Sequence, residues 1–219
     1  YYFLISKNIK VNKNLSNIFW FLSILFFYIY GCKKIFSIIF CFTNNKSFEK
    51  GVHFLNLPRE ALNICSNKQN SNYNYFTFII SYLKNKKITV NKINHDIANI
   101  DNVCDKDFNL NYSDKFNTNF DFRKRIHYFL WSIKAIVLCF VDLLRGFWWH
   151  PLLLSEAADR KLVEILNREN LHSIYLFNNT SGFAYKPMWT YAAEKKGIEI
   201  IFYFYSLNYV PNTKKPQNP

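Results

Sequence analysis

The sequence predicts an α/β fold, in which a parallel sheet is flanked by helices and an apolar helical segment comes first. Two observations predict the sheet. Between Ser155 and Asn208 the spacing of apolar residues changes between helical and strand periods, in the order helix, strand, helix, strand. The last element, Ile198 to Tyr205, is an unbroken β-branched and aromatic run, which is typical of a strand buried on both faces. Two strands joined by a helix of about ten residues form a parallel pair with a right-handed crossover.

The elements of this region have recognisable ends. Ser155 is a predicted N-cap for a helix that runs to about Asn170. A short apolar strand is predicted from Ser173 to Phe177. Pro187 suits the first turn of the second helix, and Gly197 is predicted to end that helix as a C′ glycine. The region therefore reads as a Rossmann-like βαβ unit.

The N-terminal segment is apolar. From Asn14 to Cys32 there is no charged residue, and this length is near the lower limit for a membrane span. Three interpretations compete: a transmembrane helix, a helix in the membrane interface, and a buried helix of a soluble fold. We divide the chain into an apolar N-terminal segment (1–48), for which membrane association is one of these interpretations, a Rossmann-like α/β domain (49–211, core 155–208) and a linker or truncated tail (212–219).

The middle of the chain carries weaker signals. Lys50 to Pro58 is predicted to be the first strand of the domain, and Arg59 to Cys65 a short helix. Tyr75 to Leu83 is either a strand or a buried helix, and Ile88 to Ile100 adds a strand and a turn. Asp101 to Asp121 is rich in Asn and Asp without a clear period, so we expect a long surface loop or an interdomain linker.

Arg123 to Arg145 is predicted to be an amphipathic helix, because its apolar residues recur every three or four positions. Lys134 and Asp142 interrupt it too closely for a comfortable membrane span. We expect this helix to pack on the sheet, with contact to a membrane surface as the second interpretation. The pair Trp148 and Trp149 follows it and suits a bilayer interface, a stacked sugar ring or an ordinary core.

Composition excludes several classes of protein. The net charge is +13, but the excess is mostly lysine in a chain rich in Asn, Ile, Phe and Tyr, and no arginine cluster is present, so nucleic-acid binding is not expected. The five cysteines are widely spaced, without a CxxC pair, and the histidines lack metal-ligand spacing. We therefore predict no metal site and no cofactor. His150 and Glu156 are the better-placed acid–base candidates, yet no catalytic residue is assigned.

Polar clusters follow both strands of the βαβ unit. Parallel strands end at the same edge of a sheet, where ligands of open α/β sheets bind, so we expect these clusters to lie side by side. Their amide and hydroxyl groups, with two aromatic side chains nearby, suit a saccharide. The alternative is that they are ordinary turn residues. The predicted substrate-binding residues are Asn178, Asn179, Ser181, Tyr185, Trp189, Ser206 and Asn208.

The same region carries a resemblance to a known family. The runs RGFWWHPLLLSEAADRKLV and LFNNTSGFAYKPMWTYAAEKKGIEIIFYFYSLNYVP, from roughly Arg145 to Pro211, resemble bacterial proteins of surface polysaccharide biosynthesis that look like two-domain (GT-B) glycosyltransferases. The resemblance rests on Trp148 and Trp149, on Tyr185 to Trp189, on Ala193 to Gly197 and on Phe204 to Asn208.

This resemblance implies transfer of a sugar from a nucleotide-sugar co-substrate to a saccharide or lipid-linked saccharide acceptor, with this chain as the acceptor-side half. The donor-binding Rossmann domain would follow Pro219. The implied location is the cytoplasm, with the inner face of the plasma membrane as a more specific alternative. The competing function is a non-enzymatic, membrane-associated scaffold or docking protein.

Overall fold

A computed structural model of the chain describes residues 13–40, 48–56, 85, 92–95, 103–104, 109–118, 121–179 and 186–204. In this part of the chain the predicted α/β fold is confirmed, with helices and a largely parallel sheet. The chain divides into two compact units. We call residues 1–44, 118–167 and 187–195 the helical unit, and residues 45–117, 168–186 and 196–219 the sheet unit.

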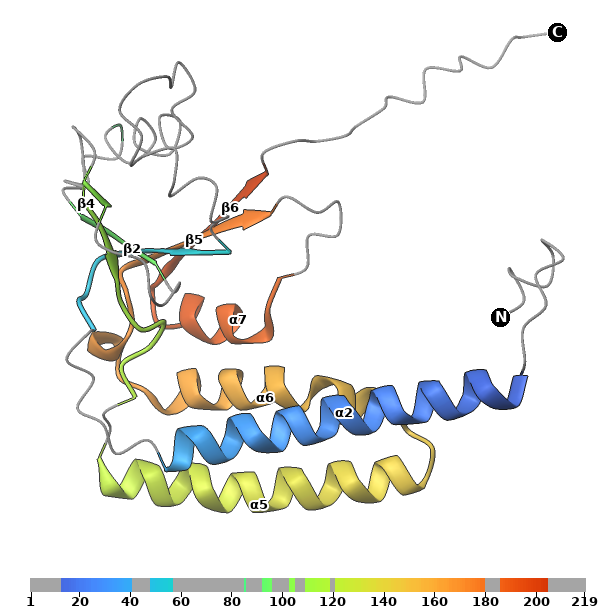
Figure 1. Ribbon diagram of the computed structural model, residues 1–219. Helices are drawn as coiled ribbons and strands as arrows, with labels where there is room; N and C mark the ends of the chain where they lie inside the picture. The colour runs from blue at the N-terminus through green and yellow to red at the C-terminus, as the bar shows by residue number, and fades with distance from the viewer. Residues whose placement is uncertain are drawn as a thin grey trace, which may run out of the picture. The chain divides into compact units, whose positions relative to one another are not determined.

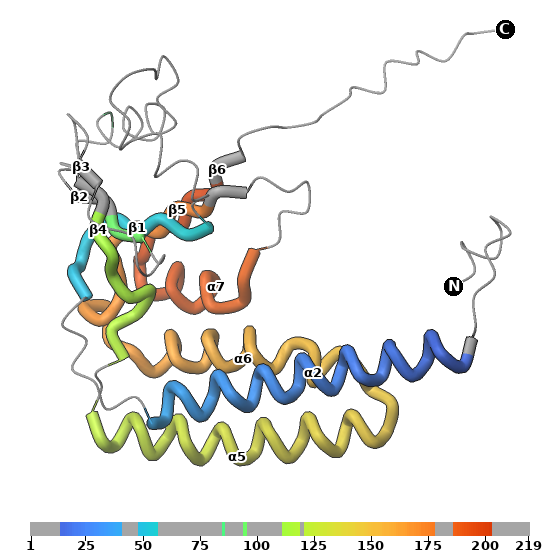
Figure 2. The backbone as a smooth tube through the Cα atoms, viewed as in Figure 1, coloured from blue at the N-terminus to red at the C-terminus, as the bar shows by residue number. Residues whose placement is uncertain are grey.

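The helical unit is built around α6 (Trp149–Ile165), which contacts α2 (Lys13–Ile39), α5 (Phe122–Leu144) and α7 (Met188–Glu194). Helices α2, α5 and α6 run side by side, and α7 lies along α6 (Figure 1). The smooth backbone trace shows the same arrangement, with α2 extending beyond the start of α6 (Figure 2).

Helix α2 includes the whole charge-free stretch of the N-terminal segment and continues to Ile39. One side of its second half packs on α6, where Ile35 is fully buried. Gly31 makes this approach close, because a Cβ atom there would lie 2.9 Å from the Cβ and Cγ atoms of Leu154. A larger residue would push the two helices apart.

The boundaries of α5 agree with the predicted helix from Arg123 to Arg145, whereas those of α6 do not agree with the prediction. Helix α6 begins at Trp149, so Ser155 lies inside it and is not its N-cap. Pro151 stands in its first turn, where a missing N–H costs nothing, and this explains the earlier start. The helix ends at Ile165, because Leu166 has an extended backbone with ψ of 146°.

The sheet unit contains six strands in the order β3-β4-β2-β1-β5-β6. All neighbouring pairs are parallel except β3 and β4. Their bounds are Val52–Leu55 (β1), Lys92–His95 (β2), Val103–Cys104 (β3), Asn109–Tyr112 (β4), Ile174–Asn179 (β5) and Glu199–Phe204 (β6). Strand β5 therefore has a parallel neighbour on each side. The predicted parallel pairing of β5 with β6, which α7 connects in the sequence, is confirmed.

Two expectations about the strands are corrected. The predicted loop from Asp101 to Asp121 contains β3 and β4, and β4 pairs with β2. Its sequence, NLNY, alternates polar and apolar residues over only four positions, and this short pattern was not recognised within an Asn- and Asp-rich stretch. The second correction concerns β6, whose residues 199–202 are only half-buried, because β6 is an edge strand of the described sheet. The predictions for Arg59–Cys65 and Tyr75–Leu83 lie outside the described residues.

Candidate functional site

The strand order places a reversal of direction at β1. From β1 the chain adds the parallel strands β2 and β4 on one side, and then β5 and β6 on the other side. This is the arrangement of a doubly wound sheet, in which ligands bind beyond the carboxyl ends of the two strands where the order reverses. In this chain those strands are β1 and β5, so the candidate crevice lies at the ends of this pair.

Asparagines follow the last residue pair between β1 and β5. Leu55 of β1 pairs with Phe177 of β5, so Asn56 and Asn178 come next on neighbouring strands. Asn56 has a φ of 58°, a left-handed conformation that asparagine adopts more readily than most residues. Asn179 pairs with Phe204 and ends β5. An asparagine amide provides both donors and an acceptor, which suits a ligand with many hydroxyl groups.

The predicted substrate-binding residues have different positions. Asn178 and Asn179 lie at the carboxyl end of β5, as the βαβ reading expects. Trp189 belongs to α7 of the helical unit and is 1% exposed, so it is a core residue of that unit. Ser181, Tyr185, Ser206 and Asn208 lie outside the described residues.

Asn56 was not among the residues predicted from the sequence. Two features of the sequence could have identified it: Asn56 lies at the end of the strand predicted from Lys50, and it comes shortly before Pro58. Only the strand order reveals its relation to Asn178, because the residues of β1 and β5 are far apart in the sequence.

A buried polar network holds the start of β5. The Tyr175 hydroxyl donates a hydrogen bond to the Lys115 carbonyl at 2.8 Å and accepts one from the His172 backbone N–H at 3.2 Å. The His172 Nε2–H donates to the Asp114 carbonyl at 2.9 Å. These bonds tie β5 to the segment that follows β4, and so fix the strand whose far end carries Asn178.

Two histidine rings stack in this network. The ring centroids of His53 in β1 and His172 are 4.4 Å apart, and both side chains are fully buried. Burial lowers the pKa of His53 to about 2 and that of His172 to about 4. Both imidazoles are therefore neutral near pH 7. They are buried beside β5 and do not offer a proton acceptor to a ligand in solution.

The helical unit contains a separate cavity of about 480 Å³ between α5, α6 and the start of α7. Its wall is mostly apolar, with Trp131, Leu138 and Leu154 among the lining residues. Polar groups are contributed by Lys134 and by the pair of Asp142 and His150.

The Asp142–His150 pair has a defined geometry. His150 Nδ1 lies 2.7 Å from Asp142 Oδ2, and the Trp149 indole N–H donates to His150 Nε2 at 3.2 Å. Since a carboxylate only accepts and an indole N–H only donates, the neutral ring carries its proton on Nδ1. This leaves Nε2 as the basic nitrogen. The pair is a candidate proton acceptor, although the position of His150 is exposed.

Among the described residues, including those of the crevice and of the helical cavity, no three His, Cys, Asp or Glu side chains are grouped to bind a metal ion.

Comparison with known proteins gives a match to a family model. Residues 131–218 match the family model described as polysaccharide biosynthesis PFTS motif protein. No curated protein and no solved structure matches the chain. The matched range contains all the residues that line the helical cavity, and it also contains β5, α7 and β6. Over this range the chain is similar to polysaccharide biosynthesis PFTS motif proteins, and the match indicates a role in polysaccharide biosynthesis.

Proposed function

We propose that this chain is part of a GT-B-like glycosyltransferase that transfers a sugar from a nucleotide-sugar donor to a saccharide or lipid-linked saccharide acceptor. The acceptor binds in the crevice beyond β1 and β5. The observation that carries this assignment is the position of Asn56 and Asn178, which come directly after the last residue pair between β1 and β5, at the reversal point of the sheet. The match to a polysaccharide biosynthesis family supports a role in polysaccharide biosynthesis, and the matched range covers β5 and β6.

The chemistry of the crevice fits a neutral, hydroxyl-rich ligand. Amide groups donate and accept hydrogen bonds without adding charge, so they can orient a sugar hydroxyl group. In the transfer, the acceptor oxygen forms a bond to the anomeric carbon of the donor. The bond from that carbon to the diphosphate oxygen breaks, the nucleoside diphosphate leaves with the electron pair, and the hydroxyl proton passes to a base. The role proposed for Asn56, Asn178 and Asn179 is to position the acceptor, and no base is assigned in the crevice.

The test uses a strain that lacks the gene and depends on the complete gene product for its surface polysaccharide. Membranes from complemented cells receive radiolabelled UDP-glucose, UDP-galactose, UDP-N-acetylglucosamine or GDP-mannose, and label in the polysaccharide is counted. Asn178→Ala and Asn179→Ala are each expected to lower incorporation about fivefold, since a hydrogen bond is worth about 1 kcal/mol. Asn56→Gly removes the third amide while keeping the left-handed backbone unstrained.

The matched control is Asn167→Ala, which removes an exposed amide of the helical unit. It should leave incorporation unchanged. Thermal unfolding of each variant separates binding from structure: residues of an open crevice contribute little to the fold, so the unfolding temperature should stay within a few degrees. If stability falls in step with incorporation, the asparagines are only strand caps.

The competing scaffold function has a different signature. If the chain is a docking protein, the strain that lacks the gene should make no polysaccharide. All three crevice variants should nevertheless show normal incorporation. The exposed apolar helices α2 and α5 give this alternative its own support.

A further inference from the structure

The first half of α2 exposes apolar side chains in every direction. From Asn14 to Ser23, all residues except Ser16 are exposed, and most of them are large and apolar. Phe19 is 60% exposed and Leu22 is 50% exposed. A helix that is apolar all round needs an apolar environment all round. The exposed large residues of α2 are Leu15, Ile18, Phe19, Trp20, Phe21, Leu22, Phe26, Phe27, Ile29, Tyr30 and Phe36.

Helix α5 adds a second apolar face. It contacts α2, and the Tyr28 hydroxyl of α2 donates a hydrogen bond to the Ile136 carbonyl of α5 at 3.2 Å. At the end of α5, Trp148 makes an edge contact with Trp20, with ring centroids 5.4 Å apart. The exposed large residues of α5 are Phe122, Ile126, Phe129, Leu130, Ile133, Val137, Leu138, Phe140 and Leu144. Together these residues form what we call the α2–α5 apolar surface.

The charges around this surface have one dominant sign. Helix α2 contains no acidic residue, and α5 contains only Asp142, which is paired with His150. Exposed basic residues flank the apolar stretches: Lys33 in α2, and Arg123 and Arg145 at the two ends of α5. This arrangement complements acidic lipid headgroups, which attract basic residues beside an inserted helix.

The length of the apolar part of α2 also suits a helix in a lipid bilayer. The charge-free stretch from Asn14 to Cys32 corresponds to roughly 28 Å of helix, close to the ~30 Å hydrocarbon core of a bilayer. Among the described residues, α2 and α5 are the two helices long and apolar enough to cross a membrane. Length and composition alone do not distinguish a core helix from a membrane helix, but α2 leaves most of its apolar residues exposed.

We propose that α2 inserts into a lipid bilayer with acidic headgroups and that the exposed face of α5 lies against the same bilayer. Lipid is favoured over a protein partner because hydrocarbon chains cover all sides of a helix, whereas a protein surface covers one. The proposal is independent of glycosyl transfer, since it uses only the α2–α5 apolar surface and its flanking charges.

The experiment measures binding of the purified chain to vesicles by co-sedimentation. Vesicles of phosphatidylcholine containing phosphatidylglycerol should bind the chain roughly tenfold or more tightly than phosphatidylcholine alone, because each basic residue near the surface adds attraction. Alkaline carbonate should leave the bound chain in the membrane fraction. Release by carbonate would mean surface adsorption and would overturn insertion.

Variants locate the inserted segment. Phe19→Asp and Leu22→Asp together should lower vesicle binding at least a hundredfold, because a charged residue is costly in hydrocarbon. Tyr191→Asp is the control: it introduces a single negative charge at a 53% exposed position of α7, which contacts α6 and not the α2–α5 apolar surface. It should bind vesicles like the wild type.

Circular dichroism in detergent checks that the Asp variants keep their helices, as expected for changes at exposed positions. If an Asp variant loses helix content, the double exchange Phe19→Leu with Leu22→Phe serves as a second test. This variant keeps both positions apolar and should bind vesicles like the wild type. A wild-type chain that remains monodisperse in lipid-free buffer as a dimer, without binding either vesicle, would overturn the proposal and assign the surface to a second copy.

Discussion

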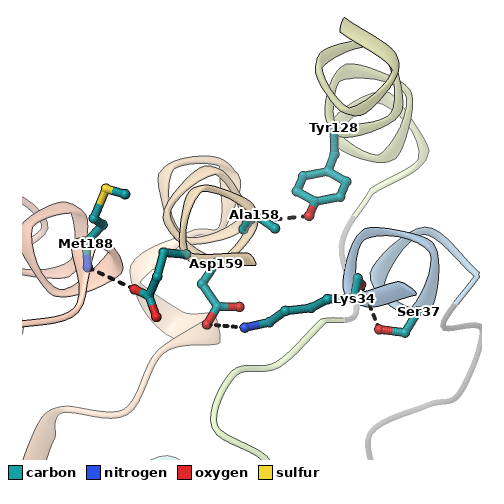
Figure 3. Close-up of polar contacts among 7 residues, drawn as sticks. Lys34, Ser37, Tyr128, Ala158, Asp159 and Met188 are labelled. Carbon is teal, nitrogen blue, oxygen red and sulfur yellow. Dashed lines mark hydrogen bonds and ion pairs between the residues drawn. The ribbon is translucent and has the colours of Figure 1, made fainter. Parts of the chain in front are cut away.

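Lys34 Nζ in α2 lies 2.8 Å from Asp159 Oδ2 in α6, and this ion pair joins the two helices on their packed side (Figure 3). The Asp159 side chain is 8% exposed, whereas that of Lys34 is 28% exposed. The carboxylate is therefore the more deeply buried partner and depends on the ammonium group for compensation.

Lys34→Met is expected to lower the free energy of unfolding by roughly 1–3 kcal/mol, because it leaves a buried carboxylate without its cation. The matched control is Lys33→Met, which removes an exposed neighbour and should change stability by under about 0.5 kcal/mol. Thermal unfolding in detergent measures both. Equal effects of the two substitutions would show that the ion pair does not stabilise the helical unit.

Gly31 makes a second prediction about the same helix pair. Gly31→Ala places a methyl group 2.9 Å from Leu154 and should cost roughly 1–3 kcal/mol through overpacking. Leu154→Ala alone should also destabilise, since it leaves a cavity. The double variant should be more stable than the sum of the two single effects predicts, because Leu154→Ala removes Cγ and Cδ2, two of the three atoms close to the new methyl group, and leaves only Cβ at 2.9 Å. Simple additivity would contradict close packing at this crossing.

The stacked histidines predict loss of stability in acid. Their folded-state pKa values, about 2 for His53 and about 4 for His172, lie below the unfolded value of about 6.5. Below pH 6.5 these histidines are therefore protonated in the unfolded chain but remain neutral in the folded chain, and the free energy of unfolding falls as pH falls. For His172 the loss should reach about 3 kcal/mol by pH 4, and stability should be level above pH 7.

His53→Leu provides the comparison. In the described part of the chain neither ring nitrogen of His53 has a hydrogen-bond partner, so replacing the ring should not break a bond. The variant should lose less stability than the wild type between pH 6.5 and pH 4, as measured by urea unfolding at each pH. His127→Leu, at an exposed position of α5, is the control for removing an imidazole from outside the stacked pair.

A substitution in the Asp142–His150 pair should affect polysaccharide production and stability differently. Because the His150 side chain is 53% exposed, His150→Gln should change the free energy of unfolding by under about 1 kcal/mol. If the cavity takes part in polysaccharide production, the same variant should lower it in the complemented strain, while His127→Gln should not. Normal production with His150→Gln would show that the pair only fastens the corner between α5 and α6.

The parts of the fold that could be predicted are those with an unambiguous local signal. Pro187 and Gly197 bracket α7, and Gly197 has the positive φ of 73° that suits a glycine near a helix end. The apolar run of β6 was recognisable as a strand, but its burial depended on its place in the sheet, which no local pattern contains. Strand β4 was missed because its alternation of polar and apolar residues covers only four positions in an Asn- and Asp-rich stretch, and its pairing with β2 is not visible in the local sequence.

The candidate site divides in the same way. Asn178 and Asn179 were found because they end a strong strand signal. Asn56 required knowledge that β1 and β5 are neighbours, and the contact between Asp142 and His150 required knowledge of how the chain turns after Gly146, whose φ is 82°. Long-range relations of this kind leave no trace in one sequence without an alignment.

The strand order also has a consequence for synthesis on the ribosome. Strand β1 is complete at Leu55, but its partner β5 begins only at Ile174, so one edge of β1 stays unpaired while all the intervening residues are translated. During that interval the apolar residues VHFL are available to wrong partners, since long-range strand pairing is slow and exposes aggregation-prone edges. A translational pause before Ile174 would therefore lengthen the interval in which this edge of β1 has no partner.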